Sequence, residues 1–175
     1  VATTHTNRIA FANSFPIAVA IATTIVSRVG GIAGISNSLV ALEGLKEKAR
    51  GVKRGNGSLM DVPSFKSKIA ALEVDLMAVE YTELRSLASA ASGNEPGPES
   101  SILKLKGTEI QQRLQRLTME AGGIYSSAWG MSNVGPSFAR SGMSGYLSSR
   151  AFTIYGGASE VQKDVVAKNV LGLKR

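Results

Sequence analysis

The sequence has no cysteine among its 175 residues, which excludes disulfide bridges, a thiol nucleophile and thiolate metal ligands. Its one histidine, His5, provides neither a metal cluster nor a catalytic triad. Aromatic residues make up only 6% of the chain, which is little for a surface that stacks nucleic-acid bases. Because absence of cysteine is typical of reducing compartments, we expect a cytoplasmic protein.

Acidic residues are also in the minority, and the formal net charge is +7. An excess of this kind admits nucleic acid, an anionic membrane or a phosphate-rich ligand as partners. The densest basic group comprises Lys46, Lys48, Arg50, Lys53 and Arg54. Since no aromatic and basic RNA-binding motif and no Cys/His finger accompanies it, we expect no nucleic-acid partner.

Long uncharged runs are rare, and the candidate for a membrane span is residues 9–27, "IAFANSFPIAVAIATTIVS". This run is long enough for a membrane span. Asn13, Ser14 and Pro16 interrupt it, however, and alanines dilute it. We therefore expect no membrane span and predict burial in a helical core.

The periodicity of apolar residues predicts helices along most of the chain. A long helix is expected over about 15–50, entered at Pro16, with Gly34 at a close contact or a kink. The polar, glycine-rich stretch 51–63 is expected to be a loop. A second helix is expected over about 64–91, with one apolar stripe formed by Phe65, Ile69, Leu72, Leu76, Val79 and Leu87.

A third helix is expected over about 99–121, with Gly107 on its packing face. Ser101 and Lys104 in it fit the S-x-x-K pattern, but the companion K-T-G motif is absent and the match is read as chance. Residues 122–149 are rich in glycine and serine and are expected to form a long loop in which Tyr125 packs. We expect 1–175 to be one domain.

A last helix is expected over about 158–171, since Ser159 and Gln162 have the spacing of a capping box and Gly172 can end the helix. The predicted fold class is all-α, an up-and-down antiparallel helical bundle.

Three segments together resemble the C-terminal helical domain of the acyl-CoA dehydrogenase family. They are "SSILKLKGTEIQQRLQRLTMEAGG", "YLSSRAFTIYGGASEVQKDVVAKNVLGL" and, more loosely, "NRIAFANSFPIA" followed by "SRVGGIAG". The second is similar to the family ending R-x-x-T-I-x-x-G-[TS]-x-E-I-Q. The resemblance covers about residues 7–175.

The resemblance implies that the closing motif faces an FAD cofactor. Two adjacent glycines permit a tight turn, and a helix N-terminus after them favours an anion such as a pyrophosphate. The residues implied at this cofactor site are Arg150, Tyr155, Gly156, Gly157, Ala158, Ser159, Glu160 and Gln162. The family usually has threonine or serine where Ala158 stands, so one hydroxyl contact is missing.

The family reaction also requires a glutamate base that removes the α-proton of the acyl thioester. The resemblance implies two positions for it, and this chain has Gly156 at one and Ser27 at the other, beside Arg28. Serine cannot serve as that base without an activator. Glu160 is the nearest carboxylate and a weak substitute.

The resemblance therefore implies a domain that contributes to FAD and acyl-CoA binding for α,β-dehydrogenation of an acyl-CoA, without its own catalytic base and inactive alone. It implies a homo- or hetero-oligomer with acyl-CoA dehydrogenase-like subunits. The family's arginine-phenylalanine loop that reaches a neighbour's FAD is not matched, and Arg54 is its only stand-in. A non-catalytic scaffold subunit that has lost the flavin stays open as the alternative.

Overall fold

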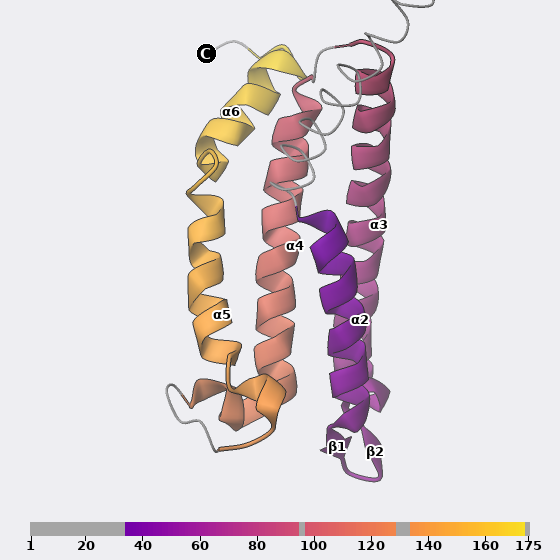
Figure 1. Cartoon of the computed structure of the whole chain (residues 1–175), viewed down its shortest axis with the longest axis vertical. Helices are drawn as coiled ribbons and strands as arrows, with labels where there is room; N and C mark the ends of the chain where they lie inside the picture. Colours follow the sequence, from indigo (N-terminus) through magenta and orange to yellow (C-terminus); the bar gives the residue numbers. More distant parts are fainter. Residues whose placement is uncertain (1–33, 95–96, 129–133, 174–175) are drawn as a thin grey trace, which may run out of the picture.

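The computed structural model describes residues 34–94, 97–128 and 134–173. Five α-helices and a two-stranded hairpin lie in these residues (Figure 1). The helices are α2 (Ile35–Gly51), α3 (Pro63–Ala91), α4 (Glu99–Gly122), α5 (Gly142–Ser148) and α6 (Ser159–Asn169), and the strands are β1 (Lys53–Arg54) and β2 (Gly57–Ser58). Short 3-10 helices are η1 (Leu59–Asp61), η2 (Gly123–Ser127), η3 (Ser137–Ala139) and η4 (Ser149–Thr153).

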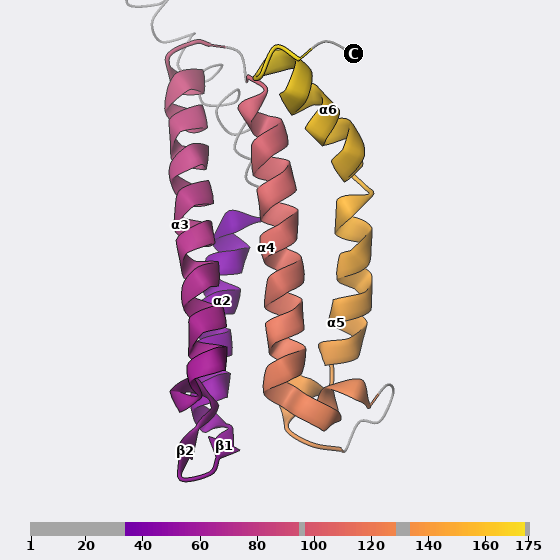
Figure 2. The same cartoon turned by 180° about the vertical axis from the view of Figure 1, so that it is seen from behind.

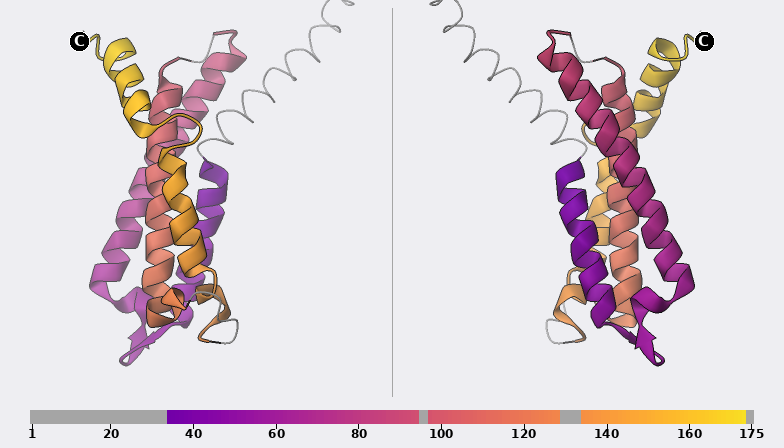
Figure 3. Two further views of the ribbon diagram at one scale, coloured as in Figure 1. Left: turned by 90° about the vertical axis from the view of Figure 1, so that its left-hand side faces the viewer. Right: turned by 90° about the vertical axis from the view of Figure 1, so that its right-hand side faces the viewer.

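The helices run up and down along one long axis, which confirms the expected all-α fold class (Figures 1 and 2). Helix α2 descends to the hairpin, α3 returns, α4 descends again, and α5 and α6 complete the bundle. In the side views α6 leans away from the direction of α5, so the chain bends between them (Figure 3). That bend carries the residues of the candidate site.

One hydrophobic core joins α2, α3 and α4. The stripe predicted on α3 is buried from Phe65 to Val79, with no exposed surface at Leu72, whereas Leu87 is only partly buried. It meets the buried face of α4 (Leu103, Ile110, Leu114 and Leu117) and the buried face of α2 (Leu42, Leu45 and Ala49). Each fully buried leucine contributes about 1.5–3 kcal/mol, so this seam dominates the stability of the bundle.

Ion pairs add to this seam at the surface. Lys68 pairs with Glu120 at 2.7 Å, and Arg113 pairs with Asp75, so both link α3 to α4. Exposed pairs of this kind contribute about 1 kcal/mol or less, and their role is to fix the register of two helices.

The face of α3 that points away from the core is also apolar. Val74, Met77, Tyr81 and Leu84 recur at helical spacing and are each more than half exposed. We call these four residues the outer stripe. A helix that is apolar on two opposite faces typically packs against a neighbour on each face.

The close contact expected at Gly34 is confirmed, since a Cβ there would collide with the Gln111 side chain, but the expected continuous helix over about 15–50 is wrong at this residue. This residue has φ +58°, and α2 begins directly after it. A left-handed residue cannot continue a right-handed helix, so the helix is not continuous through Gly34. The start near residue 15 and the uncharged run 9–27 lie outside the described residues.

The expected loop over 51–63 is partly wrong, because it contains the hairpin and η1. The strands pair antiparallel, with Lys53 opposite Ser58 and Arg54 opposite Gly57. Gly55 at φ +56° permits the tight turn between them. Ser58 and Asp61 then form a reciprocal capping box at η1, and these hydrogen bonds lower the pKa of Asp61.

The expected loop over 122–149 is also partly wrong, because its described part contains η2, η3 and α5. The glycines here predict a loop from the sequence, but two of them allow other residues to pack closely against the helix backbone. A Cβ at Gly122 would collide with Ser126 and Ala139, and one at Gly142 would lie 3.1 Å from Ser126. Tight packing thus overrides the weak helix propensity of glycine.

Candidate functional site

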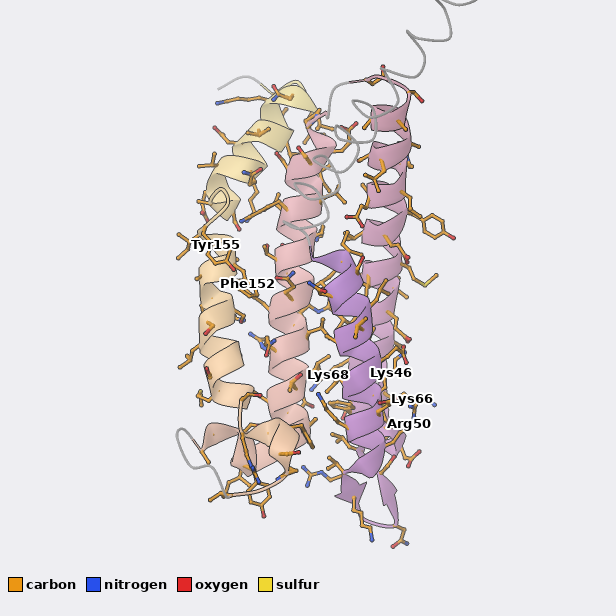
Figure 4. All side chains as sticks on the ribbon, in the orientation of Figure 1. Lys46, Arg50, Lys66, Lys68, Phe152 and Tyr155 are labelled. Carbon is orange, nitrogen blue, oxygen red and sulfur yellow. The ribbon has the colours of Figure 1, made fainter. Side chains whose placement is uncertain are left out.

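The bend between η4 and α6 is a glycine turn that projects from the bundle. Gly156 has φ +67° and Gly157 has φ +104°, values that side chains of L-residues rarely allow. Ile154 and Tyr155 before them are 70% and 58% exposed. Figure 4 shows Tyr155 at this junction of α5 and α6. We call residues 154–157 the exposed turn.

The N-terminus of α6 follows the exposed turn and is uncapped. Ala158 is the N-cap residue and makes no side-chain hydrogen bond. The first backbone N–H with a helical acceptor is that of Gln162, which donates to the Ala158 carbonyl at 3.0 Å. The amides of Ser159, Glu160 and Val161 precede it and have no acceptor within the helix.

The expected capping box is therefore wrong. Ser159 is the first helical residue, one position too late for its hydroxyl to cap the helix. The side-chain amide of Gln162 nevertheless folds back over the turn. It lies so close to Gly157 that a Cβ on this glycine would collide with it. This leaves a helix end whose partial positive charge is available to an anion.

Arg150 lies in η4, four residues before the exposed turn, and its hydrogen bonds stay within its own segment. Its Nε donates to the Tyr146 carbonyl at 3.3 Å, and its Nη2 donates to the Ser149 hydroxyl at 2.8 Å. The guanidinium lies 4.5 Å from the centre of the Tyr146 ring. Arg150 thus stiffens the junction of α5 and η4.

Seven of the predicted site residues, Tyr155 to Glu160 and Gln162, form one contiguous surface. Ser27 and Arg28 lie outside the described residues. Glu160 is the only carboxylate of the stretch 149–162, and it is exposed in the first turn of α6. At Gly156, a Cβ would have no atom within 4 Å, so a longer side chain has room there.

A second feature lies at the opposite end of the bundle, beside the hairpin. It is a pocket of about 520 Å³, with a lining that includes Lys48, Lys53, Arg54, Tyr125 and Phe138. One carboxylate, Glu47, also lines it. Tyr125, expected to pack, is 46% exposed at the pocket wall. We call this the basic pocket.

The cations of the basic pocket differ in their ion pairing from Lys46, which lies farther from the hairpin on α2. Lys46 bonds to Glu43 and Glu73; burial alone would lower the pKa of Lys46, but these hydrogen bonds raise it. Figure 4 labels Lys46 with Arg50, Lys66 and Lys68 on neighbouring stretches of α2 and α3.

Among the described residues, no carboxylate forms an ion pair with Lys48, Lys53 or Arg54. Their charge is thus available to an anionic ligand.

Of this pocket, sequence reasoning identified the basic group that contains Lys48, Lys53 and Arg54, but it assigned a ligand only to Arg54. It missed Gly122 and Gly123 at the end of α4, which form part of the wall. The signal was the double glycine itself, since Gly123 has φ +55° and marks a sharp exit from the helix.

Within the described ranges, no group of three or more His, Asp or Glu side chains is placed to hold a metal ion. In the same residues, no helix is both long and apolar enough to cross a bilayer.

Residues 17–171 match the sequence model described as acyl-CoA dehydrogenase, C-terminal domain. A search of curated proteins found no match. Among solved structures, the ChsE4-ChsE5 complex from Mycobacterium tuberculosis has a similar chain, with 26% identity and a TM-score of 0.67 over 81% of this chain and 36% of that one.

Two further structures share the fold. Butyryl-CoA dehydrogenase from Megasphaera elsdenii matches with 17% identity and a TM-score of 0.66, over 90% of this chain and 38% of that chain. Glutaryl-coenzyme A dehydrogenase with glutaryl-CoA matches with 15% identity, the same TM-score of 0.66 and the same shares of 90% and 38%. The chain thus spans a little over a third of the length of these relatives.

Proposed function

This chain belongs to the acyl-CoA dehydrogenase family, as its C-terminal domain, and on that premise we propose that it forms one wall of an FAD and acyl-CoA site. The reaction of the assembled site is α,β-dehydrogenation of an acyl-CoA thioester. The single observation that carries the proposal is the exposed turn, which leads directly into an uncapped helix N-terminus.

The residues present fit an anionic dinucleotide. The free amides of Ser159, Glu160 and Val161 and the dipole of α6 favour a diphosphate at this end of the helix. Gly156 and Gly157 remove the side chains that would stand between the backbone and a planar ring. Bound FAD supplies the hydride acceptor of the family reaction.

Three side chains have distinct roles in this proposal. Gln162 lies over Gly157 and, as a flexible amide donor, can turn toward a phosphate oxygen. Ala158 contributes no hydroxyl. Glu160 repels an anion and confines it to the amides on the other side of the helix end.

The chain itself supplies no catalytic base at Gly156 or Ser27, and we propose that it is inactive alone. Loss of a general base typically costs about 10²–10⁴-fold in rate. In the native assembly the base would then come from another subunit. In this chain a base could be introduced by Gly156→Glu, because the open space at Gly156 leaves room for a glutamate side chain.

The basic pocket provides a second anion-binding surface on the same chain. Lys104, beside the exposed turn, and Gly122, at the pocket, are separated by about 27 Å along α4 at about 1.5 Å per residue. One diphosphate cannot contact both ends of one chain. We propose that Arg54 reaches the FAD of a neighbouring subunit, and hence that the active form is an oligomer.

The outer stripe of α3 fits this assembly, because it offers an apolar surface for an acyl-CoA dehydrogenase-like partner subunit. The solved relative at 26% identity is a complex of two differently named chains, ChsE4 and ChsE5. A partner of the same family, identical or different, is the occupant that we propose for the outer stripe.

The same stripe also supports a second function, a scaffold subunit that has kept the bundle and lost the flavin. The two functions predict different absorption spectra for the purified native assembly. FAD bands in the assembly support a subunit that holds the cofactor, and bleaching of these bands by acyl-CoA would support a base supplied by another subunit. An assembly without flavin supports the scaffold and contradicts our first proposal.

A further inference from the structure

Lys104 is a buried cation that the proposed function does not use. It is 4% exposed on α4, on the face that meets η4 and α6. Among the described residues it forms no ion pair. Its Nζ donates to the carbonyl of Phe152 at 3.0 Å. Buried charges are normally held by a specific partner, and here the partner is one backbone oxygen.

That oxygen lies in the last turn of η4, directly before the exposed turn. The three preceding carbonyls of η4 have other partners: Gln112 donates to Ser149 O at 3.0 Å, and Thr153 donates to Arg150 O at 3.1 Å. Two amides, those of Ile154 and Tyr155, donate to Ala151 O at 2.9 and 3.1 Å. Lys104 thus satisfies the Phe152 carbonyl at the C-terminal end of η4, where a helix favours a cation.

The junction has little apolar packing that would replace this bond. Helix α6 buries none of its side chains, and the buried residues in the N-terminal half of α4 include the polar Ser101, Lys104 and Thr108. Phe152 stacks edge-on against Tyr155 with 5.6 Å between ring centres, so the bonded residue is coupled to the turn (Figure 4). Polar anchors therefore decide where the turn stands relative to α4.

We infer that Lys104 is a positioning residue: its ammonium group holds the Phe152 carbonyl and so fixes the exposed turn against α4. The relevance of this inference to catalysis rests on the proposed function, because the turn that Lys104 holds is the proposed contact with the flavin. The contact itself is independent of any cofactor and is testable in the free chain.

The test compares Lys104→Met, which removes the charge and every donor, with Lys104→Arg, which restores both. Lys106→Met is the matched control on α4, where the side chain is 57% exposed and pairs with Glu109. Amide hydrogen exchange of the full chain is the readout.

We expect Lys104→Met to accelerate exchange at Ile154 and Tyr155 by about tenfold or more, since a hydrogen bond from a charged group is lost. Exchange at Leu72 and Leu76 in the core should not change. Lys104→Arg should restore wild-type rates, and Lys106→Met should have no effect.

Three outcomes overturn the inference: unchanged exchange at the turn in Lys104→Met, failure of the arginine variant to restore it, or faster exchange throughout the core. The last would show that Lys104 holds the bundle rather than the turn. Flavin binding is scored separately in the native assembly. A mobile turn in Lys104→Met with no flavin in the wild type would uphold the positioning role and contradict the proposed function.

Discussion

Alanine at Gly156 or Gly157 measures how much the strained backbone of the exposed turn matters. At Gly156, φ is +67° and no atom lies within 4 Å of a new Cβ, so strain is the only cost. A left-handed L-residue costs about 1–2 kcal/mol. Reduced freedom of the unfolded chain returns about 0.4–1 kcal/mol of that. We expect Gly156→Ala to lower the free energy of unfolding by about 1 kcal/mol.

Gly157→Ala should cost more, for two structural reasons. Its φ of +104° lies outside the left-handed helical well, and the new Cβ would displace the amide of Gln162. Strained backbone of this kind costs about 1–3 kcal/mol. We expect a loss of about 2 kcal/mol, still small enough to leave the bundle folded.

Urea unfolding of the chain measures both values, with two glycines as controls. Gly93 has φ +86° and no atom within 4 Å of a Cβ, so Gly93→Ala should also destabilise the fold. Gly44 lies inside α2 with free space around it, and Gly44→Ala should stabilise the fold by about 0.5–1 kcal/mol. If Gly156→Ala behaved like Gly44→Ala, the reasoning about the turn would be refuted.

The same variants separate stability from flavin binding in the native assembly. If the turn relaxes in Gly156→Ala, restoring it on binding costs the released strain of about 1–2 kcal/mol, which lowers FAD affinity about 5–30-fold. Gly93→Ala, on the connection between α3 and α4, should not change that affinity.

Three other changes test the core, one titrating group and the outer stripe. Leu72→Ala should cost about 2–5 kcal/mol in urea unfolding, since the side chain is fully buried; a loss under 1 kcal/mol would contradict the core assignment. Burial and the neighbouring Glu80 raise the pKa of Glu83, so its ionisation opposes folding once the pH rises above the usual range of a glutamate carboxyl. Glu83→Gln should therefore stabilise the fold by about 0.5 kcal/mol or less at pH 7.5 and have no effect near pH 3.5, and the opposite pH dependence would refute the assignment. Tyr81→Glu should reduce the mass of the native assembly in sedimentation, whereas Ala71→Glu, beside the stripe, should not; equal masses would contradict an interface on α3.

The sequence predicted the long helices well because their apolar residues repeat at helical spacing. Helices α3 and α4 lie close to the expected 64–91 and 99–121. The closing motif also predicted the glycine turn before α6. Both signals are local in the chain, which is why they are readable without coordinates.

What the sequence did not predict depends on contacts between distant residues. Within 122–149, Gly142 packs against Ser126 and Gly122 packs against Ala139, each at least sixteen residues away, and no local pattern shows these contacts. Lys104 looked like a chance S-x-x-K match, since its partner Phe152 is 48 residues away. The capping box failed by one residue, because Ala158 takes the N-cap position and has no side-chain acceptor.

The most direct test of the central claim is amide hydrogen exchange at Ser159, Glu160 and Val161 in the native assembly. We predict that FAD slows exchange of these three amides and that riboflavin, which has no diphosphate, does not. Unchanged exchange at all three in an assembly saturated with FAD would contradict the claim that the start of α6 holds the cofactor.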